Sequence, residues 1–237
     1  MIRQVISALL AVTIALTLRV HFVLPRHVRP LRKKGDKCTI AIFLGSGLLT
    51  NSSEGNCGHT SEALTLVSAL DFSRYVHRIY VIAAGDTLSA QKAMALEKHK
   101  ARPTNESESA EEPSYTLITI PRARRVHQTI LTTPYTALYS LIACLYHTTI
   151  KPRLSGRRTF ADALLLNGPG TCFILAVSTY VNRILGLPSP TLIYVESFAR
   201  VRSLSLSGKL LRPLVDRFVV QWPNLMEVGA EYHGWLV

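Results

Sequence analysis

Two glycine-rich segments near the start of the chain hold the residues best suited to meet a phosphate group. Leu44-Gly45-Ser46-Gly47 ends an apolar run, and Gly58-His59-Thr60-Ser61-Glu62 opens a segment whose apolar residues recur at 63, 66, 67 and 70. That spacing is typical of one face of a helix. A glycine-rich turn from a strand into a helix N-terminus presents unpaired N–H groups and the positive end of the helix dipole to an anion. The pattern predicts a site for a nucleotide sugar or a lipid pyrophosphate.

Small and polar residues follow the later apolar runs in the same way. They are Ala84-Gly85-Asp86, Pro121-Arg122, Asn167-Gly168-Pro169-Gly170-Thr171, Glu196-Ser197 and Trp222-Pro223-Asn224. The carboxyl ends of parallel strands meet at one edge of a sheet, which is where open α/β sheets bind ligands. We therefore expect these loops to assemble one site together with the first glycine-rich turn.

The elements that position this site alternate along the chain. Strands are expected at 39–44, 78–83, 115–120, 162–166, 191–195 and 217–221, each a mostly apolar run. Helices are expected near 59–71, 87–99, 134–149, 170–185 and 207–215, and the glutamate-rich segment 102–113 is expected to be a loop. Six strands with intervening helices predict an α/β fold, a doubly wound parallel sheet.

Positive charge is concentrated near the N-terminus. The chain has 27 Lys and Arg against 15 Asp and Glu, a net charge of +12. Residues 1–37 hold eight of the basic residues and one acidic residue, which leaves 19 basic and 14 acidic side chains in the other 200 residues. Aromatic residues are not interleaved with the basic ones, so the distribution argues against a nucleic-acid partner.

The four cysteines do not form a metal-binding pattern. Cys38, Cys57, Cys144 and Cys172 have neither a C-x-x-C spacing nor a histidine at zinc-ligand spacing. We expect no metal site, and we expect the cysteines to be free, apolar thiols in a reducing compartment.

The first 24 residues are expected to form a membrane anchor, followed by a basic linker at 25–37 and a single domain at 38–237. Residues 5–24 are mostly apolar and Pro25 follows them. Twenty helical residues span about 30 Å, one hydrocarbon core. A cleaved secretory signal is the alternative, but no small-x-small cleavage site precedes a polar start.

The charges around this anchor predict its orientation. Seven basic residues follow the apolar run or lie at its end and only Arg3 precedes it, so the positive-inside rule places the domain in the cytosol. The sequons Asn51-Ser-Ser and Asn105-Glu-Ser would be acceptors for glycosylation in a lumenal domain.

Three familiar nucleotide or nucleophile motifs are absent from the sequence. After Gly45-x-Gly47 the third glycine of a dinucleotide fingerprint is replaced by Thr50, and neither the P-loop sequence Gly-Lys-Ser/Thr nor a G-x-S-x-G elbow occurs. A nucleotide-dependent oxidoreductase is therefore disfavoured.

Several motifs taken together resemble one family over residues 38–237. They are the two glycine-rich segments above, Asn167-Gly168-Pro169-Gly170-Thr171, Tyr194-Val-Glu-Ser-Phe-Ala-Arg-Val201, Ser203-Leu-Ser-Leu-Ser-Gly-Lys-Leu-Leu211 and Asp216-Arg-Phe-Val-Val-Gln-Trp-Pro223. The chain resembles the membrane-anchoring subunit of the eukaryotic UDP-N-acetylglucosamine transferase of dolichol-linked oligosaccharide synthesis, the asparagine-linked glycosylation protein 14 family.

The resemblance implies a fold, a reaction and partners. The family looks like the Rossmann-like, acceptor-binding N-terminal half of a GT-B glycosyltransferase. Its donor-binding half is a separate soluble polypeptide of the asparagine-linked glycosylation protein 13 family. The implied reaction adds the second GlcNAc to GlcNAc-pyrophosphate-dolichol at the cytosolic face of the endoplasmic reticulum, by inversion and with neither a cofactor nor a bound metal. The chain is expected to be inactive alone.

The resemblance also implies roles for individual residues. His59, at a helix start, is expected to act as the base or to orient the sugar, and a structural cap is the alternative. Glu196 is expected to act as the base or to bind a sugar hydroxyl, and a buried ion pair with Arg200 or Arg202 is the alternative. The residues expected to contact the acceptor or its pyrophosphate are Gly45, Gly47, Gly58, Thr60, Ser61, Asn167, Gly168, Gly170 and Thr171.

Three features leave alternatives open. The family pattern G-S-G-G-H-T is interrupted here by residues 48–57, which form a tolerated surface loop, displace the glycines, or reflect a mis-spliced gene model. The apolar end of the chain, 232–237, either adds a strand or packs on the partner subunit. The apolar helix at 135–150 is either a core helix or a contact with a membrane or a partner. For the whole chain, the alternative to an acceptor-binding subunit is a non-catalytic membrane recruiter.

Overall fold

Parallel strands form the centre of the domain. The computed structural model describes residues 1–24, 36–45, 58–100, 114–124, 128–168, 170–226 and 229–236. Within these ranges a seven-stranded sheet has the order β3-β2-β1-β4-β5-β6-β7, and each pair of neighbours is parallel. The strands are β1 (Thr39–Leu44), β2 (His77–Ala83), β3 (Tyr115–Ile120), β4 (Ala163–Leu166), β5 (Thr191–Val195), β6 (Arg217–Val220) and β7 (Ala230–Tyr232).

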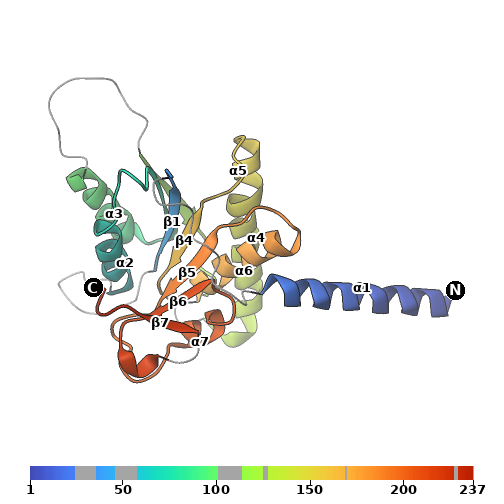
Figure 1. Cartoon of the computed structure of the whole chain (residues 1–237). Helices are drawn as coiled ribbons and strands as arrows, with labels where there is room; N and C mark the ends of the chain where they lie inside the picture. The colour runs from blue at the N-terminus through green and yellow to red at the C-terminus, as the bar shows by residue number, and fades with distance from the viewer. Residues whose placement is uncertain are drawn as a thin grey trace.

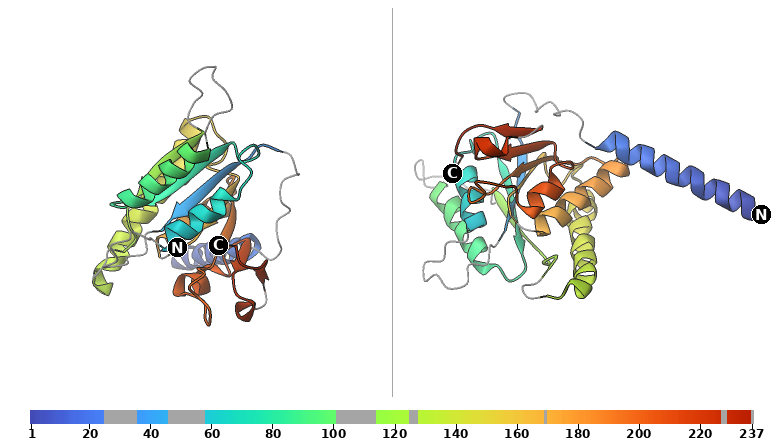
Figure 2. Two further views of the ribbon diagram at one scale, coloured as in Figure 1. Left: turned by 90° about the vertical axis from the view of Figure 1, so that its left-hand side faces the viewer. Right: turned by 90° about the horizontal axis from the view of Figure 1, so that it is seen from below.

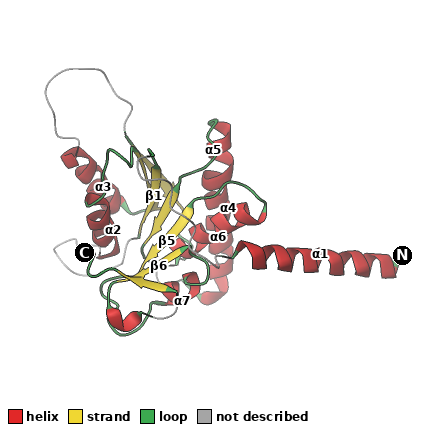
Figure 3. Cartoon of the chain, viewed as in Figure 1, coloured by secondary structure: helices red, strands yellow, loops and turns green. Residues whose placement is uncertain are grey.

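Helices cover both faces of this sheet (Figures 1 and 3). The first face is covered by α2 (Gly58–Ser68) and α3 (Thr87–Lys100). The opposite face is covered by α4 (Thr133–Leu145), α6 (Thr171–Ile184) and α7 (Leu206–Leu211). The remaining helical segments are α1 (Ile2–Val23), α5 (Lys151–Leu154), the 3₁₀ turns η1 (Ile130–Thr132) and η3 (Pro223–Leu225), and the π-helix η2 (Tyr146–Ile150).

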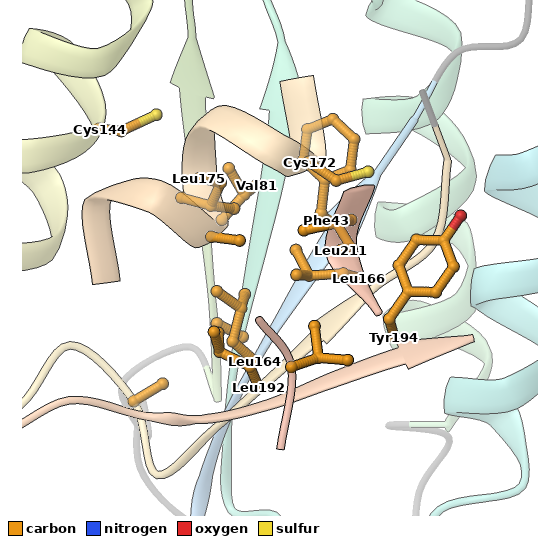
Figure 4. Close-up of a cluster of buried hydrophobic side chains, with 14 of the residues drawn as sticks. Phe43, Val81, Cys144, Leu164, Leu166, Cys172, Leu175, Leu192, Tyr194 and Leu211 are labelled. Carbon is orange, nitrogen blue, oxygen red and sulfur yellow. The ribbon is translucent and has the colours of Figure 1, made fainter. Parts of the chain in front are cut away.

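The apolar runs become buried strands because both of their faces are covered. In β1, Ala41 and Phe43 point into the cluster beneath α4 and α6, whereas Ile40 and Ile42 point into the cluster beneath α2 and α3. Figure 4 shows part of the cluster beneath α4 and α6, with Phe43 among the buried side chains. The predicted doubly wound parallel sheet is therefore confirmed.

The described cysteines are buried, as expected from the apolar segments in which they lie. Cys38, Cys144 and Cys172 are buried thiols, and the last two belong to the cluster in Figure 4. Burial raises the pKa of the Cys144 thiol to about 12. These thiols therefore act as small apolar core groups, as predicted. The predictions for Cys57, for the linker at 25–35 and for the loop at 102–113 lie outside the described residues.

Several predicted boundaries need correction. Pro152 has no N–H to continue the helical ladder, and the helix expected at 134–149 changes at Leu145 into the π-helix η2. The helix expected at 207–215 ends at Leu211, because Pro213, two residues later, has no N–H to continue the helical ladder. The strand expected at 217–221 ends at Val220, and the Gln221 side chain instead donates to the carbonyl of Glu196 at 3.0 Å.

The end of the chain adds the last strand. The strand β7 pairs with β6, and Leu236 beyond it packs against the cluster beneath α2 and α3. Figures 1 and 2 accordingly show the C-terminus beside α2. Of the segment 232–237, only Tyr232 lies in this strand and Trp235 beyond it is 67% exposed, so packing of the tail on a partner subunit stays a prediction.

The N-terminal helix α1 projects from the domain (Figure 1). It is long and apolar enough to cross a membrane by length and composition, and its tested window is 0% buried. Its C-terminal end is attached to the domain: Arg19 donates through Nε to the carbonyl of Ile184 at 3.0 Å, at the end of α6, and Val23 packs against the core. A cation at a helix C-terminus interacts favourably with the helix dipole.

Candidate functional site

The carboxyl ends of β1, β4 and β5 lie side by side, because these strands are neighbours in the sheet. The closest approach is between the turns after β1 and β4. A Cβ atom added to Gly168 would lie 3.4 Å from Cα of Gly45 and 3.7 Å from Cβ of His59, and Gly168 has φ of +128°. Only glycine adopts this conformation readily, so Gly168 is needed for the turn itself.

A chain of hydrogen bonds links the three turns. Nδ1 of His59 lies 3.0 Å from Oδ1 of Asn167, and Nδ2 of Asn167 donates to Oε2 of Glu62 at 3.0 Å. The other oxygen of Glu62 accepts from the Ser197 hydroxyl at 2.9 Å and from the backbone N–H of Phe198 at 3.2 Å. The start of α2 is thus joined to the loops after β4 and β5.

These bonds determine the tautomer of His59. The Glu62 carboxylate only accepts hydrogen bonds, so it holds the NH₂ group of Asn167 toward itself and the amide oxygen toward His59. That oxygen accepts a hydrogen bond from Nδ1–H, so Nε2 is the nitrogen of this tautomer that has a lone pair. Nε2 forms no hydrogen bond with the described residues, so it can accept a proton from a ligand hydroxyl.

Thr60 and Ser61 are already bound within the protein. The Thr60 side chain is fully buried, and its hydroxyl lies 2.7 Å from that of Ser89 and 3.3 Å from the carbonyl of Gly45. Lys92 donates to the Ser61 hydroxyl at 3.2 Å. For a phosphate, the first turn of α2 therefore offers its backbone N–H groups, which lack intrahelical partners, rather than the Thr60 side chain.

Glu196 is buried and binds backbone and hydroxyl groups. Its exposed fraction is 1%, and it accepts from the N–H of Ser197 at 3.1 Å and from the N–H and hydroxyl of Ser205 at 3.0 and 3.1 Å. Among the described residues this carboxylate forms no ion pair with Arg200 or Arg202. The bonds place Glu196 as a positioning residue for the loop that leads into α7, and its predicted role as a base stays a prediction.

Tyr194, which precedes this loop, is buried beside the same carboxylate. Its hydroxyl lies 3.4 Å from Oε1 of Glu196 and 3.2 Å from the Ser205 hydroxyl. Burial, and then the nearby charge of Glu196, raise the pKa of this phenol far above its ordinary value. Tyr194 therefore remains a neutral hydrogen-bond donor at every physiological pH.

The turn after β4 contributes differently at each residue. Asn167 is fully buried and belongs to the chain of hydrogen bonds, whereas the Thr171 hydroxyl accepts from the N–H of Ala123 at 3.3 Å. A Cβ atom on Gly170, or on Gly58 at the start of α2, would meet nothing within 4 Å. The fold leaves open space at both glycines. Gly47 lies outside the described residues.

Sequence reasoning did not select three of the polar groups that complete the site: Glu62, Ser197 and the N–H of Phe198. Glu62 follows His59 by three residues, so the two share a helix face, and that spacing was a usable signal. A basic hollow of about 420 Å³ nearby was also not predicted. It is lined by Arg202, Ser203, Leu204, Lys209, Arg212, Asn224 and Leu225, without a carboxylate.

Within the described residues, no group of three or more His, Cys, Asp or Glu side chains is placed to bind a metal ion. The site therefore consists of a histidine with a defined tautomer, a buried amide and carboxylate, and a helix N-terminus.

Comparison with known proteins decides the family. The family model described as "Oligosaccharide biosynthesis protein Alg14 like" matches residues 40–236. This chain belongs to the Alg14 family. The family resemblance inferred from the glycine-rich turns and the segments after β4 and β5 is thus confirmed.

Curated relatives agree over almost the whole chain. A Cryptococcus neoformans protein named UDP-N-acetylglucosamine transferase subunit ALG14 is 41% identical over 98% of this chain and 95% of its own length. Proteins with the same name from Schizosaccharomyces pombe and Mus musculus are 40% and 41% identical over 87% and 86% of this chain, and over 87% and 82% of their own lengths. No solved structure gives a significant match.

Proposed function

We propose that this Alg14-family chain is the membrane-anchored, acceptor-binding subunit of a UDP-N-acetylglucosamine transferase. It binds GlcNAc-pyrophosphate-dolichol and recruits a soluble donor-binding subunit to the cytosolic face of the endoplasmic reticulum, where the second GlcNAc is added. The observation that carries the proposal is the chain of hydrogen bonds from His59 through Asn167 to Glu62, at the carboxyl edge of the sheet.

His59 is the residue proposed to take the proton. Attack on the anomeric carbon of the donor requires the acceptor hydroxyl to lose a proton, and a base must lie within hydrogen-bond reach of it. Asn167 holds Nδ1 of His59, so Nε2 is left to meet the hydroxyl. Glu62 stabilises this arrangement because it fixes the amide and favours the imidazolium that forms when the proton arrives.

The acceptor pyrophosphate is proposed to bind at the N-terminus of α2. The backbone N–H groups of residues 58–61 are directed there, and the open space at Gly58 and Gly170 admits the ligand. The predicted contacts of Gly45, Gly47 and Thr171 stay predictions.

Two apolar surfaces support a position at a membrane. The helix α1 can span a bilayer by length and composition. On α4, Tyr135, Tyr139 and Ile142 are 78%, 61% and 58% exposed, and their spacing of four and three residues puts them on one face. Large apolar side chains exposed in a row are typical of a surface that lipid or protein covers.

The experiment measures transfer of GlcNAc from UDP-GlcNAc to a lipid-linked GlcNAc-pyrophosphate, in membranes that hold this chain with or without the soluble subunit. We expect transfer only with both. Transfer by this chain alone would contradict the division of labour, and no transfer from a complex shown to be assembled would contradict the proposed reaction.

The variant His59→Ala tests the role of the imidazole. Loss of a general base lowers kcat by about 10²- to 10⁴-fold, and we expect this loss with the subunit complex intact. The matched control is His99→Ala, because His99 is exposed at the end of α3, away from the site.

A non-catalytic membrane recruiter is the second candidate. It is favoured by one observation: the side chains of Thr60 and Glu196, both expected to meet the ligand, are buried and bound within the protein. Under this alternative His59→Ala leaves kcat unchanged, so the same variant decides between the two functions.

A further inference from the structure

A second cavity lies at the edge of the sheet opposite the candidate site. It is formed where β2 and β3 begin, beneath η2 and α5, and has a volume of about 290 Å³. The residues that line it are His77, Ile79, Thr116, Ile118, His147, Lys151, Pro152, Ser155, Arg157 and Phe160. The proposed transfer reaction uses none of these residues.

The charged side chains that line this cavity are both positive. Lys151 and Arg157 are cationic at neutral pH, and no aspartate or glutamate is among the lining residues. Neither cation forms an ion pair with a carboxylate in the described part of the chain. Two unneutralised cations at one cavity attract an anion, and the guanidinium of arginine matches the geometry of a phosphate.

The inner wall is apolar. Ile79, Ile118 and Phe160 are buried members of the core cluster on this face of the sheet. A cavity with an apolar wall and cationic side chains suits a ligand that has a phosphate at one end and an apolar or ring portion at the other.

A buried ring nitrogen points to a missing partner. Nδ1 of His147 is buried and has no hydrogen bond with the described residues. Burial, and then the charge of Lys151, lower the pKa of His147, so the ring is neutral at physiological pH. A buried polar atom without a partner destabilises the folded state unless a ligand or water supplies that partner. His147 belongs to the π-helix η2, a type of distortion that is frequent at functional sites.

We propose that this cavity binds a small phosphate ester. Its phosphate lies between Lys151 and Arg157, its apolar portion lies against Ile79, Ile118 and Phe160, and a polar group bonds Nδ1 of His147. His77, whose Nε2 lies 3.1 Å from the Thr116 hydroxyl, is on the opposite wall of the cavity.

Two sources supply this chemistry: a soluble nucleotide or the headgroup of a phospholipid. The second source is considered because Ile150 and Leu154, next to the lining residues in the chain, are 49% and 77% exposed. The phosphate contacts are the same for both sources, so the experiment has to separate them.

The test uses the full chain in detergent micelles and isothermal titration calorimetry. The probes are uridine monophosphate and dihexanoyl phosphatidic acid, and dihexanoyl phosphatidylcholine is the neutral-headgroup control. The variant Lys151→Gln with Arg157→Gln removes both cations of the cavity. Its matched control is Arg153→Gln with Arg158→Gln, which removes the same charge from neighbouring residues that do not line it.

We expect at least one phosphate probe to bind, with an affinity about tenfold or more lower in the cavity variant and unchanged in the control variant. Binding of uridine monophosphate alone assigns a soluble ligand, and binding of phosphatidic acid alone assigns a headgroup. The proposal is overturned if neither probe binds, or if both double variants weaken binding equally. His147→Phe is the second variant: it fills the same space without Nδ1, and we expect weaker binding with an unchanged fold.

Discussion

Gly168 shows how one residue without a side chain brings two turns of the site together. Its φ of +128° strains any residue with a side chain, and a Cβ at this position would be in van der Waals contact with Cα of Gly45, at 3.4 Å. Gly170, two residues on, has a helical φ of −47° and open space around it. The two glycines of one motif therefore differ in what they need: the first requires the conformational freedom of glycine, whereas the second has room for a side chain.

We predict that Gly168→Ala destabilises the protein and Gly170→Ala does not. A strained backbone conformation costs about 1–3 kcal/mol, which corresponds to a fall in Tm of roughly 3–10 °C for a domain of this size. Thermal unfolding of the two variants beside the parent chain measures the difference. Equal Tm values for the two variants would mean that the turn relaxes at no cost.

The two hydrogen-bond partners of position 167, His59 and Glu62, explain why an asparagine is found there. Its amide lies between a ring that must donate and a carboxylate that must accept, and an amide is the neutral group that offers both functions at once. Aspartate at this position would place two carboxylates side by side, and leucine would leave both Glu62 and His59 without this partner. The residue is thus determined by its two neighbours.

At the scale of elements, an ion pair joins the last strand to the sheet. Arg217 on β6 donates through Nε to Glu231 on β7 at 3.0 Å, and both side chains are about one quarter exposed. The hydrogen bond from Arg217 is the largest cause that lowers the pKa of Glu231 below its ordinary value of 4.5, and the hydrogen bond from His233 adds to it. The position of β7, which leads into the tail beside α2, depends partly on this pair.

The lowered pKa predicts a pH dependence of known sign. Because the folded state favours the ionised form, the stabilisation from Glu231 is fully present above pH 4.5 and is lost as the pH falls through the lowered folded-state pKa. Thermal unfolding of the parent chain and of Glu231→Gln should differ at pH 7 and converge once the pH falls below the lowered folded-state pKa. A difference that persists at the lowest pH would show that the pair contributes by packing rather than by charge.

The boundaries of a strand could be predicted from the sequence where burial restricts its residues to apolar types. Strands covered on both faces need continuous apolar runs, so β1 and β5 have the same boundaries in sequence and structure. The strand β7 has three half-buried residues at the sheet edge and gives no such run. The hydrogen bond from Asn167 to Glu62 was not predictable, because it depends on how α2 is rotated against β4.

At the scale of the whole molecule, the sequons test which side of the membrane the domain faces. Asn51 and Asn105 lie within acceptor sequences and follow the anchor in the chain. With the domain in the cytosol, neither is glycosylated. We predict no mobility shift on treatment of the expressed chain with an N-glycosidase, whereas a sequon fused ahead of Met1 is modified. Glycosylation of Asn51 or Asn105 would show that the domain faces the lumen and would contradict the proposed orientation.

Under the proposed function, the attachment of α1 to the domain gives this helix a second role besides anchoring the chain. Arg19 binds the carbonyls of Ile184 and Arg183 at the end of α6, at 3.0 and 3.4 Å, so the helix is joined to the sheet domain by more than the linker between them. A domain held at a defined angle presents its site to a lipid-borne pyrophosphate in one orientation, whereas a domain on a loose tether samples many. Orientation of reactants is worth large factors in rate.

We therefore predict that Arg19→Ala keeps the chain in the membrane but slows transfer to the membrane-bound acceptor by about tenfold. Transfer to a short-chain, water-soluble acceptor analogue should be unchanged, because that substrate does not depend on the angle of the domain. The control is Arg3→Ala, at the far end of the same helix. An equal loss with both acceptors would place the effect of Arg19 in the stability of α6, and no loss with either would make the anchor a simple tether.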